Sequence, residues 1–428
     1  MMRFCLPALC VLLLLSCATD PSSKSPIIQN LDGGLAEHYA GEYPASSQKL
    51  QEAEVLIEEA WTKSISAEAA SYFINDNTKE YAGEDYEDIY INVFNSLNYY
   101  HQGDLEGALV EIRRVSEKLA VLEQRYAKEG PSAADTTAYF LQSVSKLGIG
   151  AFNLQLPDTT KAVLYNDSAL ARYISAIFYR TEGRIDDARI DIDKLKEIYA
   201  ASPVYEGLQV PASIDEEIQT PAGMARLNFI SWTGRAPVKE QEVQLMNLYF
   251  YPVMLDVLGG FALGKIALPV LKERPSKIYN VEVEIQPLTP NNTGETLRFN
   301  LNLLENISRV IENTFLYHYN DIFVKTYVRA AIKYASVEAA AQAALRNDAP
   351  PSAVYMSVLA AKVLADVTEQ ADLRCSKNLP GQAWTGGINL QPGTYNISLH
   401  YSDGTSSVFK NVEVRPGRLN LIEDANLN

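Results

Sequence analysis

The side chains that most often carry catalysis or bind metals are scattered along this sequence. Its four histidines lie far apart, and none belongs to a pair with zinc-ligand spacing: His38, His101, His318 and His400. No serine stands in the glycine-flanked motif of a hydrolase nucleophile, and no cysteine and histidine visibly converge. We therefore predict no metal site, no cofactor and no catalytic residue, and expect a protein that is not an enzyme. An acid-base site among the carboxylates of residues 206–371 is the open alternative.

Glycine-rich residues 259–265 have the glycine and lysine spacing of a phosphate-binding loop. Ile266 stands where such a loop needs a magnesium-binding hydroxyl group, and the segment runs towards a strand instead of opening a helix. We interpret it as a glycine-rich turn between apolar segments. The surrounding apolar residues 248–271 are long enough to suggest a membrane span, but Asp256, Lys265 and several prolines and glycines favour a buried loop and strand.

Two clusters of charge lie on predicted helices. Four acids open one helix, where negative charge complements the helix dipole: Glu84, Asp85, Glu87 and Asp88. Arg113 and Arg114 follow Glu111 and interrupt an otherwise apolar helix. One arginine is expected to pair with a carboxylate inside the helical stack. The alternative is that one of them lies on a groove wall and faces an acidic partner.

The cysteine at position 17 has the sequence surroundings of a modification site. After Arg3 comes an apolar run that has the length of a signal-peptide core and is too short to span a bilayer. The run ends in Leu14-Leu15-Ser16-Cys17, which resembles the bacterial lipobox, whose cysteine receives a lipid. We predict a signal peptide over residues 1–16, lipidation of Cys17 and a flexible tether over residues 17–45. The alternative is an ordinary secretory signal in which Cys17 is incidental.

The neighbouring residue and the other cysteines extend this prediction. Ala18 follows the lipobox, and in many Gram-negative bacteria such a residue favours delivery to the outer membrane. We therefore expect a lipid-anchored protein of the cell envelope, at the outer membrane. Cys5 and Cys10 leave with the signal peptide and Cys17 is acylated, so Cys375 has no partner and no intramolecular disulfide is possible. Cys375 is expected to be a buried small hydrophobe.

The overall composition excludes some partners. With 428 residues and 47% hydrophobic residues, the chain is globular and long enough for two or three domains. Its formal charge of -16 argues against binding nucleic acid, because phosphate backbones must be met by lysine and arginine. An acidic surface also repels anionic lipid, so membrane attachment has to come from apolar chemistry.

The elements that position these residues begin with helices. Helical periodicity starts at Ser46 and predicts a helical domain over residues 46–205. Two segments share one construction, an apolar helix, a turn and a second apolar helix: residues 86–126 with a turn at Gly103-Asp104, and residues 173–199 with a turn at Gly183-Arg184. The repetition indicates stacked helical hairpins.

Small residues recur in register between the two hairpins. Gly103 and Ala108 align with Gly183 and Ala188, and the alignment resembles the tetratricopeptide repeat. A plain helical bundle is the alternative. The residues between the hairpins, 139–152 among them, are a candidate for a degenerate third hairpin.

After Pro203 the sequence predicts an α+β domain over residues 206–371, because prolines and glycines interrupt the helical periodicity. Apolar and alternating runs predict strands at residues 227–232, 265–271 and 279–285, and helical spacing predicts helices at residues 301–345 and 352–370. Residues 372–428 are expected to form a small C-terminal β segment, a hairpin or sandwich-like cap with a turn at Asp403-Gly404. The fold class is therefore mainly α.

Motifs spread over most of the mature chain carry a family resemblance: Tyr81-Ala82-Gly83-Glu84-Asp85-Tyr86-Glu87 and residues 103–114, 236–239, 265–269, 328–333 and 390–395. They are similar to motifs of a family of bacterial tetratricopeptide-type outer-membrane lipoproteins with no assigned biochemical activity. Cys375 departs from the family pattern, which has a larger residue there. In some bacteria relatives are encoded near a lipoprotein activator of peptidoglycan synthesis, so the resemblance implies an envelope role and no particular reaction.

These features lead to two hypotheses for function. The first is a non-enzymatic scaffold whose stacked helices form a groove that binds an envelope protein or peptide, while the acyl chains hold the chain at a membrane. Candidate groove residues are Asn92, Tyr99 and Arg113. The second is a module that binds glycan or peptidoglycan through aromatic side chains of the terminal β segment: Trp384, Tyr395 and Tyr401.

Overall fold

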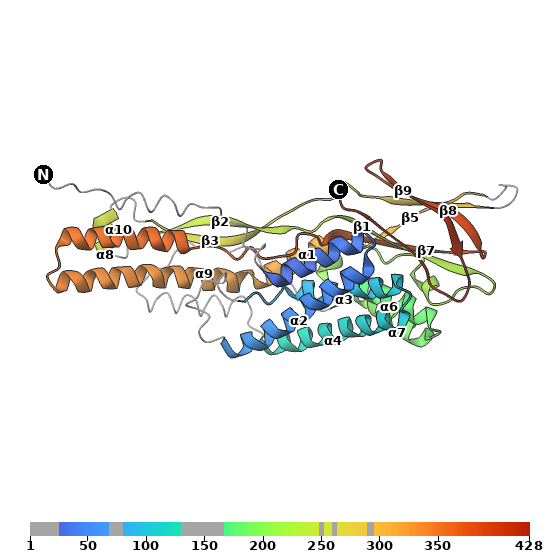
Figure 1. Cartoon of the computed structure of the whole chain (residues 1–428), viewed down its shortest axis with the longest axis horizontal. Helices are drawn as coiled ribbons and strands as arrows, with labels where there is room; N and C mark the ends of the chain where they lie inside the picture. Colours follow the sequence, from blue (N-terminus) through green and yellow to red (C-terminus); the bar gives the residue numbers. More distant parts are fainter. Residues whose placement is uncertain (1–24, 68–79, 130–166, 248–251, 259–262, 289–294) are drawn as a thin grey trace.

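The computed structural model describes residues 25–67, 80–129, 167–247, 252–258, 263–288 and 295–428. The molecule is elongated (Figure 1), with a body of helices and sheets at one end and an arm at the other. The arm consists of α8, the distal part of α9, α10 and the strands β2 and β3. The predicted order, helices first and then mixed α and β structure, is confirmed.

Three helical hairpins form the helical layers of the body. They are α1 (Pro26–Tyr39) with α2 (Tyr43–Ala67), α3 (Asp85–His101) with α4 (Leu105–Glu129), and α6 (Ala169–Thr181) with α7 (Ile185–Ala201). Each hairpin turns at a glycine with positive φ: Gly41 (+79°), Gly103 (+81°) and Gly183 (+75°). In each turn the next residue donates its amide hydrogen to a carbonyl five residues back, at 2.9 Å. The three turns therefore have one geometry, which glycine reaches without steric cost.

The first hairpin corrects the prediction of a tether over residues 17–45. Residues 26–39 form helix α1, and α2 begins at Tyr43 instead of Ser46. Ser25 caps α1, since its hydroxyl accepts a hydrogen bond from the amide of Ile28. The glycine pair at positions 33 and 34 disguises this helix in the sequence. A Cβ at Gly34 would lie 2.7 Å from Leu50, so the missing side chain allows α1 and α2 to pack closely. Residues 139–152 lie outside the described residues.

Two four-stranded sheets form the other layers. The first has the order β10-β1-β7-β6, with β10 parallel to β1 and the other pairs antiparallel: β1 (Ala225–Arg235), β6 (Asn302–Glu305), β7 (Pro380–Leu390) and β10 (Asn420–Asn426). The second is antiparallel, in the order β5-β4-β8-β9: β4 (Val281–Pro287), β5 (Leu297–Asn300), β8 (Gly393–Tyr401) and β9 (Ser406–Val414).

Strand β1 lies in the middle of the body and contributes to both cores. Ile230 and Trp232 pack among the helices, whereas Leu227 and Phe229 pack against the second sheet. This follows from the alternation of side chains along a strand. The first helix of each hairpin contacts the first sheet, as in the 4.7 Å approach of the rings of Phe94 and Trp232. The layers are thus outer helices, inner helices, first sheet and second sheet.

The C-terminal residues 372–428 do not form the separate cap that the sequence suggested. Strands β7 and β10 flank β1, and β8 pairs with β4, so these three strands complete sheets that begin earlier in the chain. Strands β7 and β8 are interior, and β10 is an edge strand. The predicted strands at β1, β3 (Leu263–Lys272) and β4, and the predicted helices α9 (Ile307–Arg346) and α10 (Pro351–Thr368), are confirmed.

The arm has its own apolar core. Antiparallel strands β2 (Val238–Asn247) and β3, with α8 (Pro252–Leu258), pack on α9 and α10. With 40 residues, α9 extends for about 60 Å. Tyr334 of α9 lies so close to Gly264 that a Cβ there would be 2.5 Å from its ring. Among the described helices, none combines the length and apolar character needed to cross a bilayer.

Candidate functional site

The strand β10 forms the edge of the first sheet, and two hollows lie along it. Among the described strands only β1 pairs with β10, so the outer edge of β10 has no strand partner. The first hollow, of about 390 Å³, is lined by residues 419–421, the end of β9 and the α3–α4 turn. The second, of about 380 Å³, is lined by residues 423–428 and the α1–α2 turn. We call β10 together with Tyr43, Tyr100, His101 and Arg418 the seam.

The carboxylate of Glu423 lies at the centre of the seam. One of its oxygens accepts hydrogen bonds from Nε1 of Trp232 (2.6 Å) and Nε2 of His38 (2.8 Å). The other oxygen lies 2.6 Å from Nε2 of His101, whose ring stacks on Tyr43 at 4.3 Å. Glu423 therefore joins β10 to β1 and to the ends of α1 and α3.

A chain of hydrogen bonds fixes the protonation of His38. The hydroxyl of Ser46 donates to the carbonyl of Gly34 (2.7 Å), so it must accept from the side-chain amide of Asn98 (2.8 Å). This orientation turns Oδ1 of Asn98 towards Nδ1 of His38 (2.7 Å), which must donate. Because Nε2 of His38 faces the carboxylate of Glu423, both ring nitrogens donate and His38 is an imidazolium.

The electrostatics of the pair agree with this assignment. Burial by itself lowers the pKa of His38, but the carboxylate of Glu423 and the bond to Asn98 outweigh burial and raise that pKa. Burial by itself raises the pKa of Glu423, but His38 and His101 outweigh it and hold that pKa far below its usual range. The pair is a buried, hydrogen-bonded ion pair that fastens the hairpin ends to β10.

The seam offers two kinds of contact to a ligand. An edge strand presents backbone amide and carbonyl groups that an extended peptide can pair with, and hollows beside it accept side chains. Exposed residues of both signs border the first hollow, Arg418 and Glu413 among them. The arrangement suits an extended polypeptide segment.

Two of the three predicted groove residues, Asn92 and Tyr99, lie on α3 and bond to α2, whereas Arg113 lies on α4. Asn92 is fully buried, and its side-chain amide donates to Glu54 (2.9 Å) and Glu111 (2.6 Å). This position does not fit the groove-lining role expected of Asn92, because no partner can reach it. Tyr99 is half-buried and accepts from Gln51. Arg113 is exposed on α4 and keeps its role as a predicted partner contact.

Arg114 pairs within the helical stack, as expected for one of the two arginines. Its guanidinium lies 3.1 Å from Glu54 and 3.5 Å from Glu111. Lys118 joins the same network through Glu54 (2.7 Å) and Asp88 (2.6 Å). The network connects α2, α3 and α4.

The acids that open α3 do more than complement its dipole. The carboxylate of Glu87 is fully buried and accepts from Tyr81, from the amide of Glu84 and, at 2.6 Å, from the amide of Ser376. Burial raises the pKa of Glu87 to about 7. Glu84 also forms an ion pair with Lys239. These acids fasten the start of α3 to the segment before β7 and to β2.

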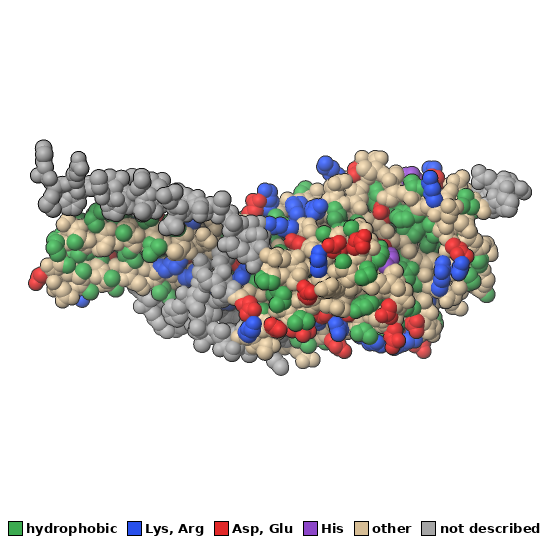
Figure 2. Space-filling view, in the orientation of Figure 1, with side chains coloured by type: hydrophobic (Ala, Val, Ile, Leu, Met, Phe, Trp, Pro, Cys, Tyr) green, Lys and Arg blue, Asp and Glu red, His purple; other side chains and the backbone are tan. Residues whose placement is uncertain are grey.

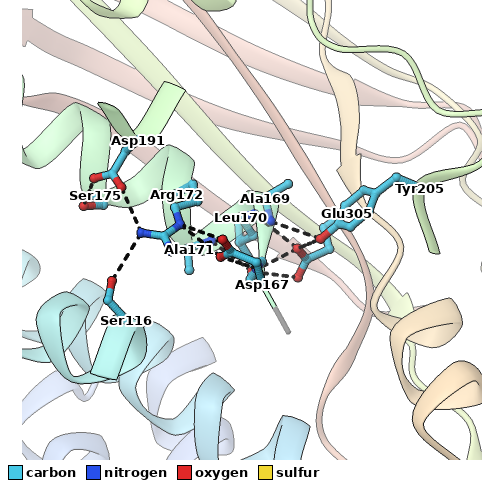
Figure 3. A network of polar contacts seen from close by, with 11 residues as sticks. Ser116, Asp167, Ala169, Leu170, Ala171, Arg172, Ser175, Asp191, Tyr205 and Glu305 are labelled. Atoms are coloured by element: carbon cyan, nitrogen blue, oxygen red, sulfur yellow. Dashed lines mark hydrogen bonds and ion pairs between the residues drawn. The ribbon is translucent and has the colours of Figure 1, made fainter. Parts of the chain in front are cut away.

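A third buried network holds the hairpin α6–α7 to the sheet (Figure 3). The carboxylate of Glu305, at the end of β6, lies at the N-terminus of α6 and accepts from Tyr90 (2.6 Å), Tyr205 (2.6 Å), Ser168 (2.9 Å) and the amide of Leu170 (3.2 Å). Beside it, Arg172 bridges Asp167 and Asp191 at 3.0 Å each. Burial raises the pKa of Glu305.

The aromatic residues proposed for glycan binding lie inside the protein. Trp384, Tyr395 and Tyr401 are buried in the core between the two sheets. Their rings present no open face, so the prediction that they stack on sugars is wrong. These aromatic residues stand out in the sequence because apolar and polar residues alternate along a strand that buries one of its faces.

The remaining sequence candidates are accounted for as follows. Cys17 and residues 259–262 lie outside the described residues, while Gly264 and Lys265 belong to strand β3. Cys375 is a buried free thiol whose pKa burial raises to about 11, as expected for a small hydrophobe. Within the described ranges, no three His, Cys, Asp or Glu side chains form a group suited to a metal ion.

The seam was not predicted, although one signal in the sequence points to it. His38 and His101 both stand near the end of the first helix of a hairpin, three and two residues before the turn glycine. Equivalent places in stacked hairpins lie side by side, so two histidines there predict a shared partner. That partner, Glu423, is far away in the sequence. The chain matches no protein-family model, no curated protein and no solved structure.

Proposed function

We propose that the chain is a lipid-anchored protein of the cell envelope that acts as a non-enzymatic interaction scaffold and binds an extended segment of a partner protein along the seam. The observation that carries this proposal is the free outer edge of β10 with a hollow at each end of it. Pairing with such an edge gives affinity through the backbone, and hollows beside it give specificity.

The helical hairpins support a scaffold of the tetratricopeptide type. Three hairpins that share one turn geometry are what tandem helical repeats require. The groove of such repeats is lined by their inner helices, and here the first sheet covers α1, α3 and α6. We therefore place the partner at the seam, where the hairpin ends meet β10, instead of in the groove.

The lipobox supports the location. A thiol acylated at Cys17 would hold the body beside a bilayer without a spanning helix, and Ala18 favours the outer membrane. The charge of -16 fits an anchor that depends on acyl chains and not on attraction to anionic lipid.

Site-specific photo-crosslinking in intact envelopes tests the seam. The photoreactive residue replaces Tyr43 or Arg418 at the seam and, as the matched control, the exposed Arg189 on α7. We expect the seam positions to crosslink to one short segment of one protein, and the control not to. Crosslinks that are equal at all three positions, or absent at the seam, would contradict the proposal.

Hydrogen exchange with the crosslinked peptide tests the mode of binding. A peptide added to the edge should slow exchange of alternate amides of β10 and leave the amides of β9 unchanged. Binding without protection of β10 would exclude strand addition.

A glycan ligand is the second candidate. Tyr43 and Tyr100 border the two hollows, and aromatic side chains in such places stack on sugar rings. Sedimentation with purified peptidoglycan sacculi separates the two ligands. Binding to sacculi that is lost in Tyr43→Ala and Tyr100→Ala would favour the glycan.

A further inference from the structure

Helix α10 leaves an apolar face uncovered on the arm. Three large side chains there are about two-thirds exposed: Met356 (67%), Leu364 (64%) and Val367 (64%). Tyr355, Leu359 and Val363 are exposed on the same helix. Hydrophobic and uncharged side chains dominate the visible face of the arm in Figure 2, whereas red and blue gather mostly on the body.

The uncovered face is wide, and its large exposed side chains are apolar. At about 100° per residue, the exposed large apolar side chains of α10 cover an arc of about 180° around its axis, between Tyr355 and Leu364, with the partly exposed Asp366 near one border of the arc. The two charged residues of α10, Lys362 and Asp366, bind each other, and Asp366 also accepts from Tyr334 of α9 at 2.6 Å. A stripe that packs on one protein partner is about 100° wide. An apolar medium covers the wider arc better than a single partner helix does.

The charge of the arm differs from that of the whole chain. Residues 322–370 carry five lysines and arginines and four aspartates and glutamates, while the whole chain has a net charge of -16. Glu338 and Glu369 are also buried. The distal helices are therefore close to neutral, and an anionic bilayer would not repel them as it repels the rest of the acidic protein.

The first described helix begins on the side of the body that faces the arm. At most about 28 Å of extended chain can separate Cys17 from Ser25, where α1 begins. Asp32 in the first half of α1 binds the backbone of Lys377 and Asn378, which follow the arm's return to the body. Figure 1 shows that α1 starts at its arm-facing end. A bilayer reached by the acyl chains of Cys17 is therefore near the arm.

We propose that the outer face of α10 lies in the interface of a lipid bilayer, as a second membrane contact besides the acyl anchor. The side chains Met356, Leu364 and Val367 enter the acyl region, while Lys362 and Asp366 keep α10 on α9. This proposal rests on the proposed function in one respect: the lipid anchor determines where the bilayer is. The apolar face is a feature of the folded arm and does not depend on the anchor.

Vesicle flotation tests the contact without the acyl group. The full chain carrying Cys17→Ser is compared with the same chain carrying Met356→Glu and Leu364→Glu, on vesicles of phosphatidylcholine and on vesicles of equal parts phosphatidylethanolamine and phosphatidylglycerol. We expect the unsubstituted face to bind both vesicles and the double variant to bind at least about a hundredfold more weakly, because two large side chains lose their burial. The matched control, Val55→Glu with Ile190→Glu, changes residues 52% and 53% exposed on the body and should bind unchanged.

A tryptophan on the face reports its depth. Met356→Trp should show a blue-shifted emission with vesicles and quenching by lipids brominated in their acyl chains. Thermal unfolding of all variants should be alike, since the changed side chains are exposed. Equal flotation of the double variant and its control, or no quenching, would overturn the proposal. A second result would also overturn it: without vesicles, light scattering gives the double variant half the mass of the chain with the unsubstituted face. A second copy of the chain would then cover the face.

The anchor is tested separately. Mass spectrometry of Cys17 reports on acylation and is unaffected by α10. A negative vesicle test therefore does not contradict the lipid anchor. An unmodified Cys17 does not contradict the membrane contact of α10.

Discussion

The buried pair of His38 and Glu423 makes the stability of the protein depend on pH. The pKa of His38 is raised in the folded state, so its contribution is full below about pH 6.5, the ordinary value, and is lost as pH rises through the raised pKa. The pKa of Glu423 is lowered, so its contribution is full above about pH 4.5 and is lost as pH falls. The pair stabilises most between these two values.

Replacing His38 should therefore cost most in that window. We expect His38→Gln to lower the free energy of unfolding by about 3 to 5 kcal/mol near pH 5.5, because it leaves a buried carboxylate with one charged partner fewer. The loss should shrink at pH 9 and above. Urea unfolding of the parent chain and of His38→Gln at a series of pH values measures this difference in the free energy of unfolding. A difference that does not vary with pH would contradict the assignment of His38 as an imidazolium.

Two adjacent arginines provide a matched pair of substitutions. Arg114→Ala removes a cation from between the buried carboxylates of Glu54 and Glu111, and should lower the free energy of unfolding by about 1 kcal/mol or more. Arg113→Ala removes an exposed side chain and should change it by less than about 0.5 kcal/mol. Equal effects in chemical denaturation would contradict the placement of Arg114 in the stack.

At the scale of elements, the hairpin turns depend on glycine. Gly103→Ala and Gly183→Ala should each lower the free energy of unfolding by about 1 to 2 kcal/mol, because a Cβ is strained at their positive φ. No atom lies within 4 Å of a Cβ at either position, so the effect is one of backbone strain alone. Gly103→Asn should cost less, since asparagine tolerates this conformation. Urea unfolding checks the predicted order of stability, in which the parent is most stable, then Gly103→Asn, then Gly103→Ala. An alanine variant as stable as the parent would contradict this order.

Periodicity predicted most elements but not how they pair. Strands β1, β3 and β4 and helices α9 and α10 were predicted because each carries a local pattern of apolar residues. Helix α1 was missed because Gly33 and Gly34 lower the helix propensity of its sequence, while the missing side chain of Gly34 makes room for Leu50. The parallel pairing of β10 with β1 joins residues almost two hundred positions apart, and no local pattern encodes it.

The same limit governs the candidate site. The pairing of Arg114 inside the stack could be predicted, because a cation near an acid on an apolar helix needs a partner. Asn92 was placed wrongly, because a polar residue on a helix can face another helix as readily as a groove. Glu423 could not be found, since its partners His38 and His101 come from the other end of the chain.

At the scale of the molecule, body and arm have different tasks in this account. The body holds its layers together with buried, hydrogen-bonded carboxyl groups at Glu423, Glu87 and Glu305, of which Glu423 is paired with His38, and offers the edge of β10 to a partner. The arm carries an apolar helix face and little net charge. A partner bound at the seam would thus be held at a fixed distance from the bilayer that the arm and the anchor share.

The proposed location depends on acylation of Cys17, which mass spectrometry of the native protein from envelopes measures directly. The account predicts that the mature chain begins at Cys17 and that this residue carries the added mass of fatty acyl groups. A mature chain with an unmodified Cys17 thiol, or one whose first residue lies elsewhere, would contradict it.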